Sequence, residues 1–331
     1  MRVALDAFGS DNAPQPEIEG AVFAIKEDLC QEVILVGNEE ILGREMSKYF
    51  YDPERIKIMH ASERIEMGDK AAASVRNKRD SSIVRCVALQ KEGAADVSVS
   101  AGNTGAMMSA SLLTLGRMKN VLRPAIAGVF PTQQGPQIIL DIGANVDCNA
   151  QHLVQFAVMG SKYFEYFFKE SQPRVSLLNI GEESAKGNIL SQEAHQLMAD
   201  NQDINFIGNI EGKDVLSGIT DVIVCDGFVG NVMLKTIEGV GFSIFAILKE
   251  QINKDWIAKL GAMLSYPVYS YIKKKMDHTE YGGALLVGIN GVSVISHGRS
   301  NAKAIKNAIR FGVRIAESGF VDNTKHYFER L

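Results

Sequence analysis

The chain has 331 residues, of which 46% are hydrophobic and 22% are charged, so it has the composition of a globular protein and room for two domains or one large α/β unit. Its net charge of −4 argues against a broad nucleic-acid-binding surface. The four cysteines lack CxxC spacing, so neither a zinc site nor a disulfide framework is expected. Asp6 interrupts the first apolar stretch, so no export signal is expected, and a cytoplasmic location fits the cysteine usage.

Short runs rich in Val, Ile and Leu alternate with segments of helical length along the chain. Strands are expected at 2–7, 33–37, 56–60, 96–100, 125–131, 137–142, 174–180, 204–208 and 221–225, with a pair near 285–297. Helices are expected at 15–28, 39–50, 69–91, 104–117, 150–170, 189–200, 228–253, 256–275 and 301–318. This alternation predicts an α/β fold with βαβ units and a mainly parallel sheet. No low-complexity linker appears, so any second domain should share that sheet.

One stretch breaks the alternation. In 129–140 (VFPTQQGPQIIL) two apolar runs flank a turn rich in Gln, Gly and Pro. This pattern predicts a hairpin, and therefore an antiparallel element in the sheet.

Polar, glycine-rich clusters follow many of the apolar runs. The dipeptide Gly-Asn occurs five times, at 37–38, 102–103, 187–188, 208–209 and 230–231. In open α/β sheets, ligands bind outside the carboxyl ends of the strands. The clusters therefore predict a ligand cleft at the strand ends.

The cluster 100–106 (SAGNTGA) lies between a predicted strand and a predicted helix. The free N–H groups of such a helix start favour an anion, and Ser100, Asn103 and Thr104 add side-chain donors beside Gly102 and Gly105. The alternative is a plain helix start, because Asn and Thr are good N-caps. Neither a Walker loop nor a GxGxxG dinucleotide fingerprint is present.

Two further clusters follow strands in the middle of the chain. The first, 141–147 (DIGANVD), offers Asn145 and Asp147 as candidates, and Asp147 could equally cap the next helix. The second, 179–188 (NIGEESAKGN), places Lys186 and Asn188 on a turn where a lysine can reach a phosphate or an oxyanion. Lys186 could instead pair with the neighbouring glutamates in solvent.

The last two clusters lie in the C-terminal third. The segment 225–235 (CDGFVGNVMLK) places Asp226 at a strand end, Asn231 at a helix start and Lys235 one turn later. The segment 296–309 (SHGRSNAKAIKNAI) places His297, Arg299 and Asn301 before an amphipathic helix, where His297 serves either catalysis or structure. Cys148 and Cys225 have no histidine beside them, so they are interpreted as small buried residues and not as nucleophiles.

The predicted helix 228–253 is apolar on more than one face and therefore needs to be covered. We expect a second subunit to cover it in a C2 homodimer; burial within one subunit is the alternative. The segment 254–276 combines aromatic and apolar residues with lysines, including Lys273, Lys274 and Lys275. This composition favours peripheral membrane contact, with a dimer interface as the alternative. No run reaches the roughly 20 apolar residues of a spanning helix.

Taken in order, the clusters resemble the phosphate acyltransferases of bacterial phospholipid synthesis, the PlsX family. The resemblance runs nearly end to end, through LDAFGSDNAP (5–14), VRNKRDSS (75–82), SAGNTGA (100–106), DIGANVDC (141–148), NIGEESAKGN (179–188), GNIEGKD (208–214), CDGFVGNVMLK (225–235), TEYGGA (279–284) and SHGRSNAKAIKNAI (296–309). The chain departs from the family's common first motif at Phe8, Ser10 and Asn12, and has Ala71 where a proline is usual.

The resemblance implies a single three-layer α/β/α sandwich over 1–331, similar to phosphotransacetylases and isocitrate-type dehydrogenases, with a protruding helical pair in 228–276. It implies transfer of a long-chain fatty acyl group from acyl carrier protein to inorganic phosphate, without a cofactor or a metal. It also implies an enzyme that is peripheral at the membrane and supplies acyl-phosphate to a membrane glycerol-phosphate acyltransferase.

Direct attack of phosphate on a thioester requires positioning and oxyanion donors but no protein nucleophile. The candidate catalytic residues are Lys186, Asn231 and His297. The candidate phosphate- and substrate-binding residues are Asp6, Ser100, Gly102, Asn103, Thr104, Gly105, Asn145, Asp147, Asn188, Asp226, Lys235 and Asn301.

Three alternative functions follow from the same residues. A phosphotransacetylase that uses coenzyme A would need a similar site. A metal-dependent dehydrogenase is less consistent with the sequence, because no nucleotide fingerprint appears. A membrane-associated scaffold that binds acyl carrier protein would not need polar clusters at so many strand ends.

Overall fold

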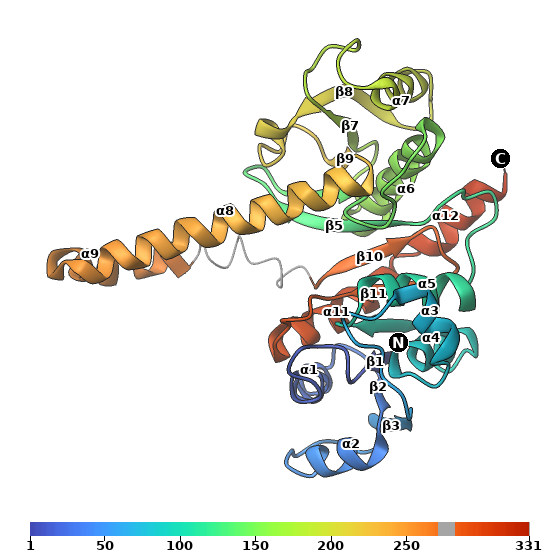
Figure 1. Ribbon diagram of the computed structural model, residues 1–331, viewed down its shortest axis with the longest axis vertical. Coiled ribbons are helices and arrows are strands. Elements are labelled where there is room, and N and C mark those ends of the chain that lie inside the picture. Colours follow the sequence, from blue (N-terminus) through green and yellow to red (C-terminus); the bar gives the residue numbers. More distant parts are fainter. Residues whose placement is uncertain (271–281, 331) are drawn as a thin grey trace.

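The computed structural model describes residues 1–270 and 282–330, and in them the chain forms one mixed sheet of eleven strands between layers of helices (Figure 1). The predicted α/β sandwich with a mainly parallel sheet is confirmed, since seven of the ten strand pairings are parallel. The strands are β1 (Arg2–Asp6), β2 (Glu32–Gly37), β3 (Ile56–His60), β4 (Val97–Ser100), β5 (Ala125–Pro131), β6 (Pro136–Leu140), β7 (Arg174–Asn179), β8 (Asn205–Glu211), β9 (Val222–Val224), β10 (Ala284–Val287) and β11 (Val292–Ile295).

The strand order is β3-β2-β1-β4-β11-β10-β5-β6-β9-β7-β8. The three antiparallel pairings are consecutive in the middle of the sheet, between β11 and β10, β10 and β5, and β5 and β6. The last of these is the hairpin predicted at 129–140. Because there are three reversals, the two parallel blocks, β3-β2-β1-β4-β11 and β6-β9-β7-β8, run in opposite directions. The carboxyl ends of their strands therefore point to opposite sides of the sheet. The polar clusters therefore do not all meet at one edge.

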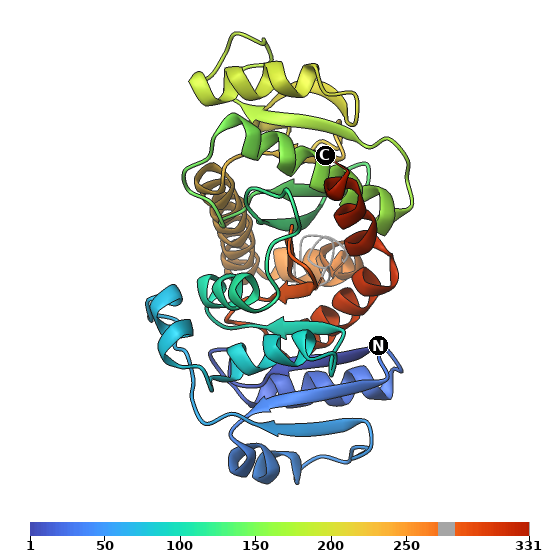
Figure 2. The same cartoon turned by 90° about the vertical axis from the view of Figure 1, so that its right-hand side faces the viewer.

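The helices cover both faces of this sheet. They are α1 (Gln15–Lys26), α2 (Glu39–Met46), α3 (Ala71–Asn77), α4 (Ser82–Lys91), α5 (Thr104–Thr114), α6 (Ala150–Phe168), α7 (Ile189–Ala199), α8 (Gly227–Lys254), α9 (Trp256–Leu264), α11 (Ala302–Glu317) and α12 (Phe320–Glu329), with a short 3₁₀ turn at Gly212–Asp214. Figure 2 shows α11 and α12 (red) on the opposite side of the sheet from α3 and α5 (cyan).

Strand β4 illustrates how the sequence divides the core between these two sides. Val97 and Val99 point into the largest apolar cluster, which also contains residues of α1, α6 and α11. Ser98 and Ser100 alternate with them and point to the other face, where both are buried. The face that carries the serines is the one on which the cavity described below lies.

One predicted helix is two helices in the structure, and one helix was not predicted. The helix expected over 69–91 is two helices, because Lys78 leaves the helical conformation and the Ser81 hydroxyl donates a 2.7 Å hydrogen bond to the Lys78 carbonyl. This bond stabilises a turn between α3 and α4. The sequence analysis also missed α12, which begins after Gly319 at a φ of +75°.

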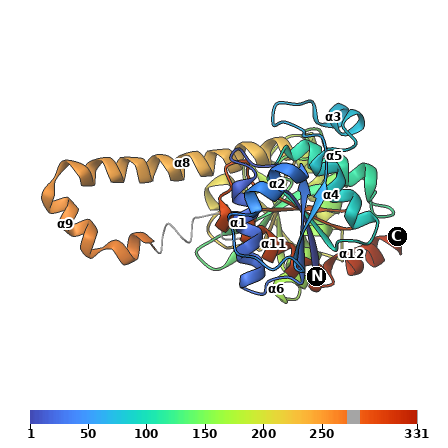
Figure 3. The same ribbon diagram turned by 90° about the horizontal axis from the view of Figure 1, so that it is seen from below.

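Helices α8 and α9 extend away from the rest of the molecule as an arm (Figures 1 and 3). Only 6% of the most apolar 18-residue window of α8 is buried, so the described residues of one subunit leave most of this helix exposed. That window has a mean hydropathy of 1.4, so α8 passes a test of length and composition for a membrane-crossing helix. It still holds no unbroken apolar run of about 20 residues, because Lys235 and Glu238, with Gly, Ser and Thr, interrupt its apolar residues.

The second helix of the arm is shorter than the 256–275 expected. A turn at Ser265, just before Pro267, ends α9, and residues 266–270 form helix again. Trp256 and Leu264 are about three-quarters exposed. Lys273, Lys274 and Lys275 lie outside the described residues.

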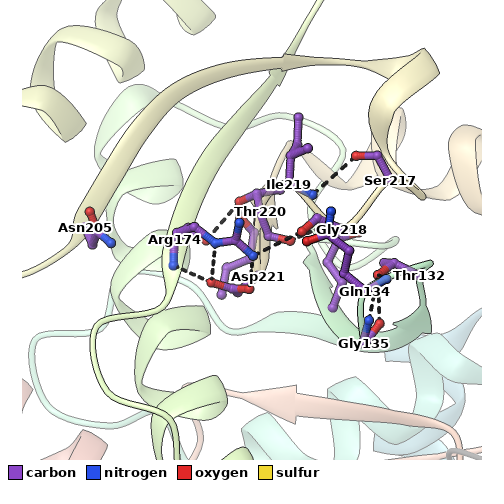
Figure 4. Close-up of polar contacts among 12 residues, drawn as sticks. Thr132, Gln134, Gly135, Arg174, Asn205, Ser217, Gly218, Ile219, Thr220 and Asp221 are labelled. Atoms are coloured by element: carbon purple, nitrogen blue, oxygen red, sulfur yellow. Dashed lines mark hydrogen bonds and ion pairs between the residues drawn. The ribbon is translucent and has the colours of Figure 1, made fainter.

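A polar cluster fixes the start of the second parallel block (Figure 4). The Arg174 guanidinium donates to both carboxylate oxygens of Asp221, at 3.0 and 2.8 Å, and to the Gly218 carbonyl at 3.0 Å. Nearby, Thr132 accepts hydrogen bonds from the backbone N–H groups of Gln134 and Gly135 in the β5–β6 turn. The first contacts join the start of β7 to the segment before β9, and the second close the turn of the β5–β6 hairpin.

Candidate active site

A cavity of about 490 Å³ lies over the face of the three central strands. Its floor includes Ile126 and Gly128 of β5, Ala284 of β10 and Ile295 of β11. Ala284 pairs with both Gly128 and Ile295, so these side-chain positions share one face of the sheet. Helix α5 borders the cavity on one side and the first turns of α8 border it on the other. The cavity therefore lies between the two parallel blocks and not at one edge.

Polar groups from four segments line the same cavity. Gly102, Thr104 and Gly105 come from the start of α5, and Asn231, Lys235 and Glu238 come from one face of α8. The loop after β11 supplies Ser296, His297, Gly298 and Arg299, and the loop after β1 supplies Asp11.

The loop before α5 is supported from beneath by Asp6 and Ser100. The Ser100 hydroxyl donates to Asp6 Oδ2 at 2.7 Å and accepts from the Gly102 N–H at 3.0 Å. Burial raises the pKa of Asp6, while hydrogen bonds from Ser82 and Ser100 oppose that shift. Asp6 and Ser100 are thus buried beneath the cavity lining and shape it from behind.

Two more contacts fix this loop. A Cβ at Gly9 would lie 2.7 Å from the Gly102 backbone nitrogen, so only glycine permits this close approach. Asn103 caps α5 by accepting from the Ala106 N–H, and its side-chain amide donates to the carbonyls of Glu66, Met67 and Asp69. Asn103 is therefore the helix cap that the sequence allowed, and it also ties α5 to the preceding loop.

The loop after β6 folds around the carboxylate of Asp141. This carboxylate accepts hydrogen bonds from the backbone N–H groups of Gly143, Ala144 and Asn145 and from the Asn145 side chain at 2.8 Å. Burial raises the pKa of Asp141. The Asn145 amide also donates to the Pro124 carbonyl, so Asn145 is buried and serves the loop rather than the cavity. Gly143 does line the cavity, beside Asn231.

The other predicted site residues lie outside the cavity lining. Asp226, Asn188 and Asn301 are the N-caps of α8, α7 and α11. Asp147 is exposed, and Lys186 is exposed on the loop after β7. Strand β7 is separated from β5 by β6 and β9, which at about 4.8 Å per strand places it roughly 14 Å away across the sheet.

Six predicted residues do line the cavity: Gly102, Thr104, Gly105, Asn231, Lys235 and His297. The sequence analysis left Asp11 and Arg299 out of the predicted site although both belong to noted motifs. It also missed the apolar wall, which has no motif. Arg299 could have been predicted because it lies two residues after His297 in the same motif.

The charges around the cavity are mixed. Lys235 and Arg299 are cations, and neither side chain forms an ion pair with another described residue, whereas Asp11 and Glu238 are acidic. The His297 ring accepts a hydrogen bond from the Arg299 N–H at 3.1 Å, which orders this loop. Two cations and the N-terminus of α5 favour an anion in the cavity, although Asp11 and Glu238 line it as well.

Neither metal chemistry nor thiol chemistry has an evident centre in the described part of the chain. No group of three His, Cys, Asp or Glu side chains with metal-binding geometry occurs there. Burial raises the pKa of Cys148 to about 11 and raises that of Cys225 as well, so both thiols stay protonated near neutral pH. Cys225 is buried, as interpreted, whereas Cys148 is only half-buried.

Comparison with known proteins gives a consistent result. Residues 1–323 match the family model described as "Fatty acid synthesis protein". A phosphate acyltransferase of Dictyoglomus thermophilum is 50% identical over 318 residues, covering 96% of this chain and 94% of the relative. A phosphate acyltransferase of Fusobacterium nucleatum is 46% identical over 330 residues, covering 99% of both chains.

Solved structures with a similar fold are more distant in sequence. A phosphotransacetylase from Streptococcus pyogenes superposes with a TM-score of 0.63 at 17% identity, covering 96% of this chain and 94% of that one. A 4-hydroxythreonine-4-phosphate dehydrogenase from Klebsiella pneumoniae gives a TM-score of 0.53 at 14% identity, covering 96% and 98%. At these identities the likeness concerns the fold alone, and it agrees with the fold relationship expected from the sequence.

Proposed function

Since this chain belongs to the phosphate acyltransferase family of fatty acid synthesis proteins, we propose that its central cavity binds inorganic phosphate beside an acyl thioester and transfers the acyl group to phosphate. The chain is accordingly a phosphate acyltransferase. The donor that we propose is a long-chain fatty acyl group carried by acyl carrier protein.

One observation supports this proposal most strongly: the cavity combines cationic and N–H groups that suit an anion with an apolar wall. Lys235, Arg299 and the N–H groups at the start of α5 suit a phosphate dianion. Met108, Phe130 and Leu234 line the same cavity and suit a hydrocarbon chain. A phosphate acyltransferase has to hold both kinds of group next to each other.

The proposed step is a direct substitution at the thioester. A phosphate oxygen attacks the carbonyl carbon, the C–O bond forms, and the C–S bond breaks with release of the carrier thiolate. A thiol pKa near about 8.5 makes the thiolate a good leaving group, so little acid assistance is required. Positioning of the two substrates can contribute up to about 7–11 kcal/mol, and one oxyanion donor about 2.7–4 kcal/mol.

In this proposal, Lys235, Arg299 and Thr104 hold the phosphate, while Asn231 and His297 lie beside the thioester carbonyl. Lys186 and Asn188 remain predictions. They belong to the loop after β7, which leaves the same edge of the sheet as the loops after β6 and β9. If the Lys186→Ala variant keeps the wild-type rate, Lys186 is not part of the active site.

The arm α8–α9 supports the proposed partners. Its exposed apolar surface fits a C2 homodimer, and the aromatic and apolar tip around Trp256 and Leu264 fits peripheral contact with the inner face of the cell membrane. From there the acyl-phosphate would reach a membrane glycerol-phosphate acyltransferase.

A comparison of two donors tests the proposal. Palmitoyl-acyl carrier protein and palmitoyl-coenzyme A are supplied at equal concentrations with phosphate, and the acyl-phosphate product is identified by mass spectrometry. The proposal expects product from the carrier-protein donor. A preference for coenzyme A would favour a phosphotransacetylase, and binding of carrier protein without any product would favour a scaffold.

A further inference from the structure

One carboxylate lies among the groups that we assign to phosphate. Asp11 lines the cavity together with Thr104 at the start of α5 and Arg299 in the loop after β11. Asp11 is exposed, and its carboxylate forms no hydrogen bond or ion pair with another described residue. A carboxylate repels an anion that has no proton to share, so its presence in an anion site calls for a physical reason.

The backbone around Asp11 is fixed by two hydrogen bonds. The Ser10 N–H donates to the carboxylate of the buried Glu17 at 2.9 Å, and the Asp11 N–H donates to the Gly298 carbonyl at 2.8 Å. A Cβ at Gly298 would lie 3.1 Å from Asp11 Oδ1. The fold therefore holds the Asp11 carboxylate against the loop that carries Arg299.

The other end of the same segment contacts the loop before α5. A Cβ at Gly9 would lie 2.7 Å from the Gly102 nitrogen and 3.0 Å from the Ala101 nitrogen, so the two backbones touch there. Segment 9–11 thus joins the start of α5, through Gly9, to the loop after β11, through Asp11. These are two of the segments that supply the cavity with groups suited to an anion.

The chemistry of phosphate gives a carboxylate a use at this place. Near neutral pH, hydrogen phosphate keeps one P–OH group that can donate a hydrogen bond, whereas sulfate offers only acceptor oxygens. A hydrogen bond from P–OH to a carboxylate is charge-assisted and therefore strong. A sulfate in the same position would place two unprotonated anionic groups against each other, which disfavours its binding.

We infer that Asp11 accepts a hydrogen bond from the P–OH group of the bound phosphate and thereby selects hydrogen phosphate against sulfate. This inference rests on the proposed function, because it assigns Asp11 to the anion of the same site. No proton is transferred in this contact. The proton stays on its phosphate oxygen, while a different, unprotonated oxygen attacks the thioester carbonyl.

The test measures the KM for phosphate in acyl-phosphate formation and the inhibition constant of sulfate as a competitor. In the wild type the inhibition constant should exceed the KM at least about tenfold, because a site that hydrogen-bonds a substrate hydroxyl rejects an analogue without it. Asp11→Asn keeps the shape of the side chain, removes its charge and adds an amide that can donate to sulfate. The ratio of the two constants should then fall at least about tenfold, as expected for loss of a hydrogen bond to a charged group.

Glu238→Gln is the matched control, because Glu238 also places a carboxylate in the cavity lining, on α8. Removal of its charge should change the binding of both anions in the same direction and leave their ratio near that of the wild type. Asp11 is exposed, so Asp11→Asn should fold, and urea unfolding checks this. If that variant unfolds, Asp11→Ser also removes the charge and should lower the ratio.

Three results would overturn the inference: a wild-type ratio near one, an unchanged ratio in Asp11→Asn, or an equal fall of the ratio in Glu238→Gln. Wild-type protein that forms no acyl-phosphate with any donor would instead overturn the proposed function.

Discussion

The Ser100 hydroxyl donates a 2.7 Å hydrogen bond to Asp6, and both side chains are almost completely buried beneath the loop that starts α5. The same hydroxyl accepts from the Gly102 N–H, so one atom connects the end of β1 to the backbone that lines the cavity. This arrangement places the candidate phosphate-binding N–H groups without exposing a carboxylate to the anion.

Ser100→Ala should therefore damage phosphate binding although Ser100 does not line the cavity. The change leaves the Gly102 N–H without its acceptor and removes one of the hydrogen-bond donors to Asp6, which should lower the free energy of unfolding by about 1–3 kcal/mol. It should also raise the KM for phosphate, because the loop 101–105 loses its support. Urea unfolding and initial rates at varied phosphate measure the two effects.

Ser98→Ala is the control for the loss of a buried hydroxyl from the same strand. Ser98 is fully buried and interacts with Ser293 and the Val292 carbonyl, away from the loop. It should lose stability while keeping the wild-type KM for phosphate. Equal changes of KM in the two variants would contradict the role given to Ser100.

Lys235→Ala should weaken phosphate binding directly. Lys235 lines the cavity on α8, and a hydrogen bond to a charged group contributes about 1.5–3 kcal/mol, so the KM for phosphate should rise about tenfold or more. Lys249→Ala removes an exposed lysine farther along the same helix and should leave that KM unchanged. A similar KM in both variants would exclude Lys235 as a phosphate ligand.

The sequence predicted the fold class well because strand and helix periods are local. It also offered Asn103 as a helix cap, since capping residues act within one turn of their own helix, but it placed Asp226 at a strand end and Asn231 at the helix start, whereas Asp226 is the cap. It could not predict which polar clusters lie close together, because that depends on the relative direction of the two parallel blocks of strands. The hairpin near 285–297 was expected, but its pairing with β5 is a contact between distant segments.

The same limit explains the differences at the site. Lys186 and Lys235 look alike in sequence, each within a glycine-rich cluster after a strand, yet only Lys235 lies on a helix face that borders the cavity. Gly128 belongs to no motif either, although Ile142 and Phe130 pack so closely against it that an added Cβ would lie 2.9 and 3.0 Å from them. Residues that line a space through long-range packing leave little local signal.

Glu17→Gln should change the pH dependence of stability. Glu17 is fully buried on α1 and accepts from the Ser10 N–H at 2.9 Å; burial, with a smaller effect from Asp6, raises its pKa from 4.5 to about 7. The folded state thus binds a proton more tightly than the unfolded state. Stability from this group is fully present below about pH 4.5 and is lost as the pH rises through about 7.

The rise in the pKa of Glu17, at about 1.4 kcal/mol for each pKa unit, corresponds to about 3 kcal/mol of unfolding free energy. Glutamine keeps an acceptor for Ser10 but does not titrate. The difference in unfolding free energy between about pH 5 and about pH 8 should therefore be smaller in the variant by a substantial part of that amount. Identical pH profiles of urea unfolding for the two proteins would contradict the assignment.

Cys148→Ala should leave kcat unchanged. Burial raises the pKa of this thiol to about 11, so it is protonated near neutral pH and is a weak nucleophile. Steady-state rates and alkylation with iodoacetamide at neutral pH check this together. A large fall in kcat, or rapid inactivation that the variant escapes, would show that a thiol takes part.

The central claim is that phosphate itself attacks the thioester in this cavity. The most direct measurement mixes enzyme and palmitoyl-acyl carrier protein in a rapid-quench experiment, with and without phosphate, and follows the free carrier thiol. Direct attack predicts steady release with phosphate and none without it. A burst of thiol equal to the enzyme concentration in the absence of phosphate would reveal an acyl-enzyme intermediate and contradict the claim.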